Sequence, residues 1–167
     1  MTKASAGILL YRRAPAAPGG AEVLLVHPGG PYYARRDDGV WSVPKGEAGP
    51  GEDDLLAVAR REFGEETGAD PLALAAPGSA PVPLGSVKQR GHKVVTVWAL
   101  EGDWDPSALR SNEFEAEWPP RSGRRARFPE VDRAAWFDLD TARRKLVEGQ
   151  RRFVDELAAL LAGGRRP

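Results

Sequence analysis

Residues 60–69 read RREFGEETGA, and their pattern places a helix in the middle of the chain. Glu62, Glu65 and Glu66 crowd the last turn and a half before Gly68, a residue that commonly ends helices. At about 100° per residue, their side chains share one arc about 100° wide. A helix C-terminus carries partial negative charge, so each carboxylate there is disfavoured by roughly 0.3–1 kcal/mol, and neighbouring carboxylates repel. The pattern therefore predicts that something outside the helix compensates its acidic end.

The residues upstream complete this helix. Asp53 or Asp54 suits the N-cap, where a carboxylate accepts hydrogen bonds from free backbone N–H groups. We expect the helix to run from there to about Thr67. Its predicted buried stripe, which recurs at helical spacing and would pack on a sheet, consists of Leu55, Leu56, Ala59 and Phe63.

Apolar or alternating runs bounded by glycine and proline predict strands on both sides of the helix. The predicted strands cover residues 5–12, 22–27, 40–43, 83–89, 92–102, 112–118 and 131–137, whereas 44–54 and 119–130 are predicted loops. Two terminal helices follow, one capped by Asp138 or Asp140 and one with the buried stripe Phe153, Leu157, Leu160 and Leu161. Without a repeat or a linker, residues 1–167 are predicted to form a single α+β domain, an α/β/α sandwich around a mixed β-sheet.

Composition limits the partners of the chain. Lys plus Arg and Asp plus Glu both number 24, so the formal net charge is zero and no global attraction to nucleic acid or anionic membrane follows. The absence of cysteine excludes disulfides and thiol chemistry. No apolar run reaches signal-peptide or membrane-spanning length. We expect a cytoplasmic protein in which any site for a polyanion is local.

Two interpretations of the acidic arc are open. It is a solvated helix face, with Arg60 and Arg61 forming surface ion pairs worth about 0–1 kcal/mol. Alternatively, it binds a hard cation, since Mg²⁺ prefers carboxylate and carbonyl oxygens and retains substrate phosphates. The glycine-rich loop directly upstream favours the cation, which would also offset the repulsion among the acids.

Residues 46–69, GEAGPGEDDLLAVARREFGEETGA, resemble the Nudix box of the Nudix hydrolases, G-x5-E-x7-R-E-U-x-E-E-x-G-U with U a bulky aliphatic residue. The matching fixed positions are Gly46, Glu52, Arg61, Glu62, Glu65, Glu66 and Gly68. Phe63 and Ala69 stand at the U positions, and eight residues instead of seven separate Glu52 from Arg61. The added residue would rotate Glu52 by about 100° if it lay on the helix, whereas a bulge in the loop would absorb it.

The resemblance implies a Nudix-type α/β/α sandwich and a metal-dependent hydrolase. Glu62, Glu65 and Glu66 would ligate Mg²⁺, or Mn²⁺, together with the carbonyl oxygen of Gly46, and Arg61 would orient the acids. The implied reaction is hydrolysis of a pyrophosphate linkage in a nucleoside diphosphate joined to another moiety. Divalent ions suit it because they screen phosphates and lower the pKa of water.

The proton acceptor is either a glutamate of the box or a carboxylate elsewhere. Glu113, Glu115 and Glu117 alternate along a predicted strand, and Glu117 is our candidate among them. The ordinary interpretation is the solvent-facing side of an antiparallel strand. His27 and His92 lack partners at metal or catalytic-triad spacing, so we expect them to be structural.

Substrate contacts are expected from the loops. Lys45 adjoins Gly46, and the alternatives Lys88 and Lys93 are equally well explained as strand-edge charges. In the long loop before residue 40, a tyrosine could stack on a base and an arginine could bind phosphate. The residues considered there are Tyr32, Tyr33, Arg35 and Arg36, with Tyr33 and Arg35 as the candidates. The tryptophans are expected in the core or on sheet faces.

Within the family, WSVPKGE, REFGEETG and EWPPRSGR resemble a bacterial branch of predicted nucleoside triphosphate pyrophosphohydrolases. Hydrolases of dinucleoside polyphosphates often carry a tyrosine downstream of the box, whereas all tyrosines here lie upstream. ADP-ribose hydrolases often carry a proline there, which Pro81 or Pro83 would match. These two activities and a non-catalytic nucleotide sensor are the alternatives, and a homodimer is possible in this family.

Overall fold

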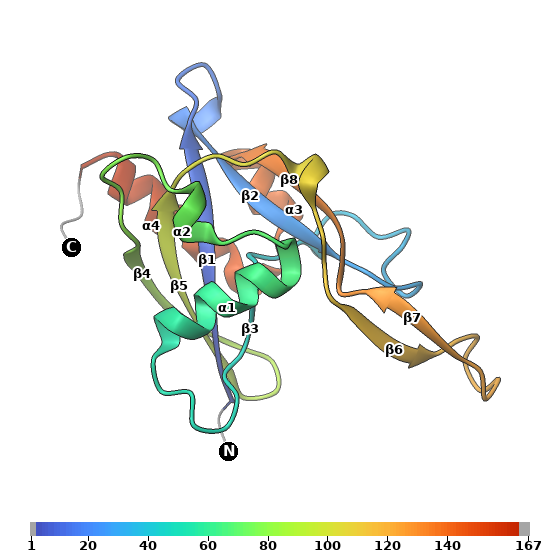
Figure 1. Ribbon diagram of the computed structural model, residues 1–167. Helices are drawn as coiled ribbons and strands as arrows, with labels where there is room; N and C mark the ends of the chain where they lie inside the picture. The colour runs from blue at the N-terminus through green and yellow to red at the C-terminus, as the bar shows by residue number, and fades with distance from the viewer. Residues whose placement is uncertain (1–2, 164–167) are drawn as a thin grey trace.

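The computed structural model describes residues 3–163 and shows a mixed β-sheet between helices on both faces (Figure 1). The sheet contains β1 (Lys3–Arg13), β2 (Ala21–Pro28), β3 (Lys45–Glu47), β4 (Val82–Gln89), β5 (Lys93–Glu101) and β8 (Val131–Asp138). A separate hairpin contains β6 (Glu113–Glu117) and β7 (Arg125–Pro129). The helices are α1 (Leu55–Thr67), α2 (Pro71–Leu74), α3 (Leu139–Lys145) and α4 (Arg151–Leu161), with short 3₁₀ turns at Pro18–Gly20, Pro106–Ala108 and Glu148–Gln150. None of the helices within residues 3–163 has the length and apolar character needed to cross a membrane.

Strand β1 is the centre of the sheet. The strand order is β4-β5-β1-β2-β8, and β1 runs parallel to β5 and antiparallel to β2. Alternate residues of β1 are buried on opposite faces: Ile8 packs in the core under α1, and Leu9 packs in the core under α3 and α4. Burial on both faces explains why this strand is apolar almost throughout. The predicted α/β/α sandwich with a mixed sheet is confirmed.

One edge of β1 serves two partners, and this opens the sheet. Tyr11–Arg13 of β1 pair with β2, whereas Ser5–Gly7 pair with the short strand β3. Beyond Val23, β2 no longer pairs with β1 and remains paired with β8 on its other edge. The space between the diverging strands β2 and β3 is where the cleft described below lies.

Helix α1 begins and ends as its sequence predicts. The Asp54 carboxylate accepts hydrogen bonds from the N–H groups of Leu56 and Ala57, at 3.1 and 3.2 Å. Gly68 ends the helix in the left-handed conformation, with φ of 84°, which glycine adopts without strain. The buried face differs in part from the prediction, because Val58 is buried with Ala59 and Phe63 while the two leucines of the first turn are only half-buried.

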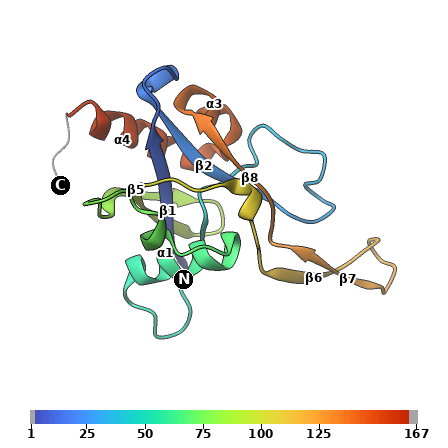
Figure 2. The ribbon, with the colours of Figure 1, turned by 45° about the horizontal axis from the view of Figure 1, so that its top comes forward.

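Four local predictions were wrong. Residues 40–43 form isolated bridges at Trp41 and Ser42 and no strand, because they cross between β2 and α3. Each of the two predicted loops contains a strand. In the first loop β3 pairs with β1, and in the second β7 pairs with β6. The β6–β7 hairpin projects from the sheet in both views (Figures 1 and 2), so Trp118 at its outer end is 41% exposed and lies outside the core.

Candidate functional site

The acidic end of α1 lies against the backbone of β3. The backbone N–H of Lys45 donates to Oε1 of Glu66 at 3.2 Å. At the next residue, a Cβ on Gly46 would collide with the carboxylate of Glu62. Only a residue without a side chain lets that carboxylate approach the strand this closely, which explains the glycine at the head of the motif.

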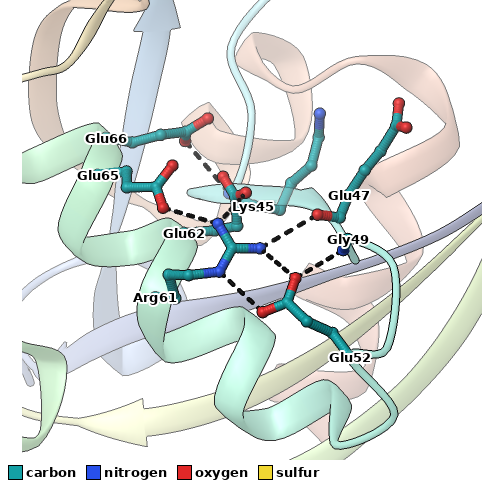
Figure 3. Close-up of polar contacts among 8 residues, drawn as sticks. All are labelled: Lys45, Glu47, Gly49, Glu52, Arg61, Glu62, Glu65 and Glu66. Atoms are coloured by element: carbon teal, nitrogen blue, oxygen red, sulfur yellow. Dashed lines mark hydrogen bonds and ion pairs between the residues drawn. The ribbon is translucent and has the colours of Figure 1, made fainter.

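Arg61 lies among three carboxylates (Figure 3). Its Nη1 donates to Glu62 at 2.9 Å and to Glu65 at 2.7 Å. Its Nε and Nη2 donate to the two oxygens of Glu52, at 3.0 and 2.8 Å, in a bidentate pair. These acids raise the pKa of the Arg61 guanidinium, so it stays charged. Arg61 thus contacts two of the three glutamates that it is predicted to orient.

Glu52 joins the cluster in spite of the added residue in the motif. It lies in the loop before α1, where the rotation of a helix does not apply. Its Oε1 also accepts from the N–H of Gly49 at 2.6 Å, which fixes the loop. The hydrogen bonds from Arg61 and Gly49 lower the pKa of the Glu52 carboxyl. The loop therefore absorbs the insertion.

Three acids of the site are partly desolvated. Burial raises the pKa of Glu66 to about 8, with Lys45 opposing the shift. Burial is also the main cause of the raised pKa of Glu62 and of a further acid, Glu130, to which the charge of Glu65 adds. Burial disfavours the ionised form of these carboxyl groups, so a nearby cation stabilises them more than it would an exposed carboxylate.

Glu130 reaches the site through backbone hydrogen bonds. The N–H of Asn112 donates to the carbonyl of Glu65 at 2.8 Å, and the N–H of Glu130 donates to the carbonyl of Asn112 at 2.7 Å. These bonds bring the base of the β6–β7 hairpin to the end of α1. No spacing in the sequence marks this residue, because the contact exists only in the folded chain.

The donor set suits a hard divalent cation. Glu62, Glu65 and Glu66 carry carboxylate oxygens, and the backbone of Gly46, whose carbonyl was predicted as a further ligand, lies against the carboxylate of Glu62. Mg²⁺ prefers oxygen ligands of this kind. Across the part of the chain that is described, no three acidic or histidine side chains already converge as a preformed metal site. Arg61 holds two of the acids in that arrangement, so the chemistry of the residues fits the ion while their side chains would rearrange around it.

A cleft of about 810 Å³ adjoins this cluster. Its acidic lining residues are Glu66, Glu130 and Glu148. Its cationic lining residues are Arg36, Lys45, Lys88, Arg90 and Lys93, and its apolar lining residues include Val26, Val40, Val131 and Val147. The cleft therefore combines an acidic centre, a cationic wall and an apolar wall.

The structure places the predicted substrate residues unevenly. Lys45 and Tyr33 line the cleft, and the alternatives Lys88 and Lys93 line it too. Arg35 is exposed and does not line the cleft, whereas its neighbour Arg36 does.

The structure does not bring Glu117 to the cluster. Its carboxylate accepts from the N–H groups of Arg121 and Gly123, at 3.1 and 2.9 Å, in the turn of the hairpin. That turn is the outer end of the projecting β6–β7 hairpin (Figure 2). Glu113 and Glu115 pair with Arg127 and Arg125 across the same hairpin. Of the acids outside the box, Glu130 and Glu148 line the cleft, and the backbone of Glu130 is linked through Asn112 to the end of α1.

Known proteins share this architecture. The sequence model of the NUDIX domain matches residues 1–157. An Ap4A hydrolase of C. elegans in a binary complex is 21% identical, with a TM-score of 0.62 and coverage of 97% of this chain and 99% of that one. The NUDIX domain of Shewanella oneidensis NrtR with ADP ribose is 17% identical, with a TM-score of 0.60 and coverage of 96% and 89%. A MutT protein of Methanosarcina mazei is 18% identical, with a TM-score of 0.57 and coverage of 96% and 95%. No curated protein matches the chain in sequence.

Proposed function

This chain belongs to the Nudix family of pyrophosphohydrolases, and from that premise we propose that it hydrolyses nucleoside triphosphates to a nucleoside monophosphate and pyrophosphate, with Mg²⁺ at the glutamates of α1. The observation that carries the proposal is that acidic, cationic and apolar side chains together line one cleft beside the box glutamates. A nucleotide with a phosphate chain presents matching parts. Its phosphates carry the negative charge that lysines bind, and its base offers an apolar face.

The cationic wall suits a chain of phosphates. Lys88 and Lys93 lie on paired strands that end at the same hairpin, and Lys45 approaches from β3. Lys93 forms an ion pair with Glu47 at 3.6 Å and the charge of Lys45 acts on Glu66, whereas within residues 3–163 no ion pair occupies Lys88 or Arg90. Three or more phosphates would extend from the acidic centre along this wall.

The apolar wall suits the base. Four valines line it, and beside them lie Ser42 and Gln150. Gln150 is buried, and its amide oxygen accepts from the N–H of Val43 at 2.9 Å while its nitrogen donates to Ser42 at 3.0 Å. Tyr33, at the rim, offers a ring for stacking.

The chain's own residues supply positioning and proton transfer. When bound, Mg²⁺ screens the phosphates and makes water more acidic. Lys45 would hold the phosphate next to the acids, and Glu130 would accept the proton of the attacking water. The oxygen of that water bonds to phosphorus as the anhydride P–O bond breaks, and the electron pair of that bond leaves with the pyrophosphate.

Dinucleoside polyphosphates and ADP-ribose are the alternative substrates. The NrtR domain was solved with ADP ribose, and the C. elegans protein is an Ap4A hydrolase, but identities of 17% and 21% carry only the fold to this chain. The full set of box carboxylates favours an enzyme over a sensor, because a sensor would tolerate their loss.

A Mg²⁺-dependent screen tests the proposal. The substrates are nucleoside triphosphates, their oxidised forms, dinucleoside polyphosphates, ADP-ribose and nucleotide sugars, with products separated by chromatography. We expect monophosphate and pyrophosphate from a triphosphate, and a loss of at least about a hundredfold with Glu66→Gln, because metal ions contribute several kcal/mol to such reactions. Equal turnover by Glu66→Gln, or faster hydrolysis of another substrate class, would refute it.

A further inference from the structure

His27, at the end of β2, is completely buried and contacts two acceptors. Its Nδ1 lies 2.7 Å from Oδ1 of Asp132 on β8. Its Nε2 lies 2.7 Å from the carbonyl oxygen of Arg36. The edge of its ring also meets Trp41, with 5.2 Å between the ring centroids. The histidine thus joins the sheet to residues 29–40, which we call the cleft loop.

The two partners fix the protons on the ring. A backbone carbonyl can only accept, so Nε2 must carry a proton. An ionised carboxylate also only accepts, so Nδ1 must carry one as well. Both hydrogen bonds therefore exist together only when His27 is an imidazolium. Histidine is the side chain whose charge most readily changes near neutral pH.

The cleft loop bears the residues that depend on this contact. Tyr33 and Arg36 line the cleft, and the guanidinium of Arg36 lies 4.4 Å from the ring centroid of Tyr32. The other end of the loop is held elsewhere: Lys145 of α3 donates to Asp37 at 2.6 Å, and the N–H of Gly39 donates to the carbonyl of Arg144. His27 holds the loop at the carbonyl of Arg36, three residues after Tyr33.

We propose that His27, held between Asp132 and the carbonyl of Arg36, is a positioning residue that keeps Arg36 and Tyr33 at the cleft while its ring is doubly protonated. This inference rests on the proposed function, because it assigns these two residues to the nucleotide. A neutral ring can donate only one of the two hydrogen bonds. Loss of the proton releases either Asp132 or the loop, and the nucleotide then binds more weakly.

The charged groups around the ring come from the elements packed against it. In β8, the cleft loop and α3 they are Asp132, Arg133, Arg36, Asp37 and Lys145. Arg133 lies 3.7 Å from the carboxylate of Asp132, and Lys145 neutralises Asp37. Asp132 is the acid that contacts the ring, so replacing it tests how its carboxylate affects the protonation of His27.

The variant Asp132→Asn makes the sharpest test. The amide nitrogen of asparagine can donate to Nδ1, and a neutral ring still donates from Nε2 to Arg36. Both hydrogen bonds then survive without the charge. Between pH 6 and pH 9 we expect the KM of the wild type to rise roughly three- to tenfold, as the loss of one hydrogen bond implies, while the KM of Asp132→Asn stays flat. The two proteins should show the same pH dependence of kcat.

A second measurement does not need activity. In ¹⁵N spectra of the histidine rings at pH 6, we expect both nitrogens of His27 to be protonated in the wild type and only Nε2 in Asp132→Asn. The chain has two histidines, so His27→Gln assigns the signals. A neutral His27 ring at pH 6, or a KM of Asp132→Asn that follows the wild type, would overturn the proposal. Absence of any nucleotide hydrolysis together with the expected spectra would instead refute the proposed function and leave the proton assignment standing.

Discussion

The end of α1 and the β6–β7 hairpin both carry three glutamates at regular spacing, yet they differ in how those charges are balanced. On the hairpin, Glu113 and Glu115 each face an arginine of β7 and are exposed. At the end of α1, Glu62 and Glu65 share Arg61 with Glu52 and are more deeply placed. Regular spacing of acids therefore does not by itself identify a cation site. A cation site is indicated where partly buried carboxylates outnumber the positive charges beside them, because negative charge is then left for a cation.

The largest expected contrast concerns proton transfer. Glu130→Gln should lower kcat by about 10²–10⁴-fold, the usual contribution of a general base, while leaving KM nearly unchanged. Glu117→Gln, at the outer end of the hairpin, should leave both constants unchanged because its carboxylate only caps the turn. Steady-state kinetics on the two variants tests which of the two glutamates is the general base. Full activity in Glu130→Gln, or a large loss in Glu117→Gln, would refute Glu130 as the general base.

A smaller effect is expected from the arginines. Arg61→Lys loses the bidentate pair with Glu52 and the contacts to two box glutamates, and a group that orients metal ligands is typically worth about 10–100-fold in affinity or activity. We expect the Mg²⁺ concentration needed for half-maximal activity to rise by this factor.

Arg127→Lys is the matched control on the hairpin, where the residue contacts only Glu113 in an exposed pair. It should leave the Mg²⁺ dependence unchanged. A shift of equal size in both variants would mean that the contacts of Arg61 to the box glutamates are not its cause.

What the sequence predicted well is local. The cap at Asp54, the stop at Gly68 and the three acids before it depend on neighbours within one helix, where spacing fixes direction. The buried runs of β1 and β2 were likewise predictable, because each strand contains an unbroken apolar run, at residues 8–11 and 23–26.

What could not be predicted depends on distant pairing. β7 reads as a loop because RARFP has arginines and a proline, and it becomes a strand only beside β6. Glu130 reaches α1 through the backbone of Asn112, and Arg36 instead of Arg35 faces the cleft at the carbonyl that His27 holds. Neighbouring residues in a loop cannot be told apart until their backbone partners are known.

The smallest expected effect separates the two regions by stability. Burial raises the pKa of Glu66 from 4.5 to about 8, so between these pH values the folded protein binds more protons than the unfolded chain. The free energy of unfolding therefore falls as pH rises through this window, and the stabilisation present below pH 4.5 is lost above pH 8. Without metal, we expect the Tm of the wild type to fall relative to Glu66→Gln, by on the order of 5 °C, since 1 kcal/mol shifts Tm by about 2–4 °C at this size.

Added Mg²⁺ should reverse this trend at the end of α1 and leave the hairpin unaffected. Only the carboxylate form ligates the ion, so binding releases a proton and stabilises the wild type more at pH 8 than at pH 6. Glu66→Gln should gain less Tm from Mg²⁺ at pH 8, whereas Glu115→Gln should match the wild type at every pH because its exposed pair contributes little. Calorimetric scans at both pH values, with and without the ion, measure all three proteins. If Mg²⁺ raised the Tm of Glu66→Gln as much as that of the wild type, binding of the ion would not depend on the carboxylate of Glu66. The proposed difference in ion binding between the end of α1 and the β6–β7 hairpin would then be refuted.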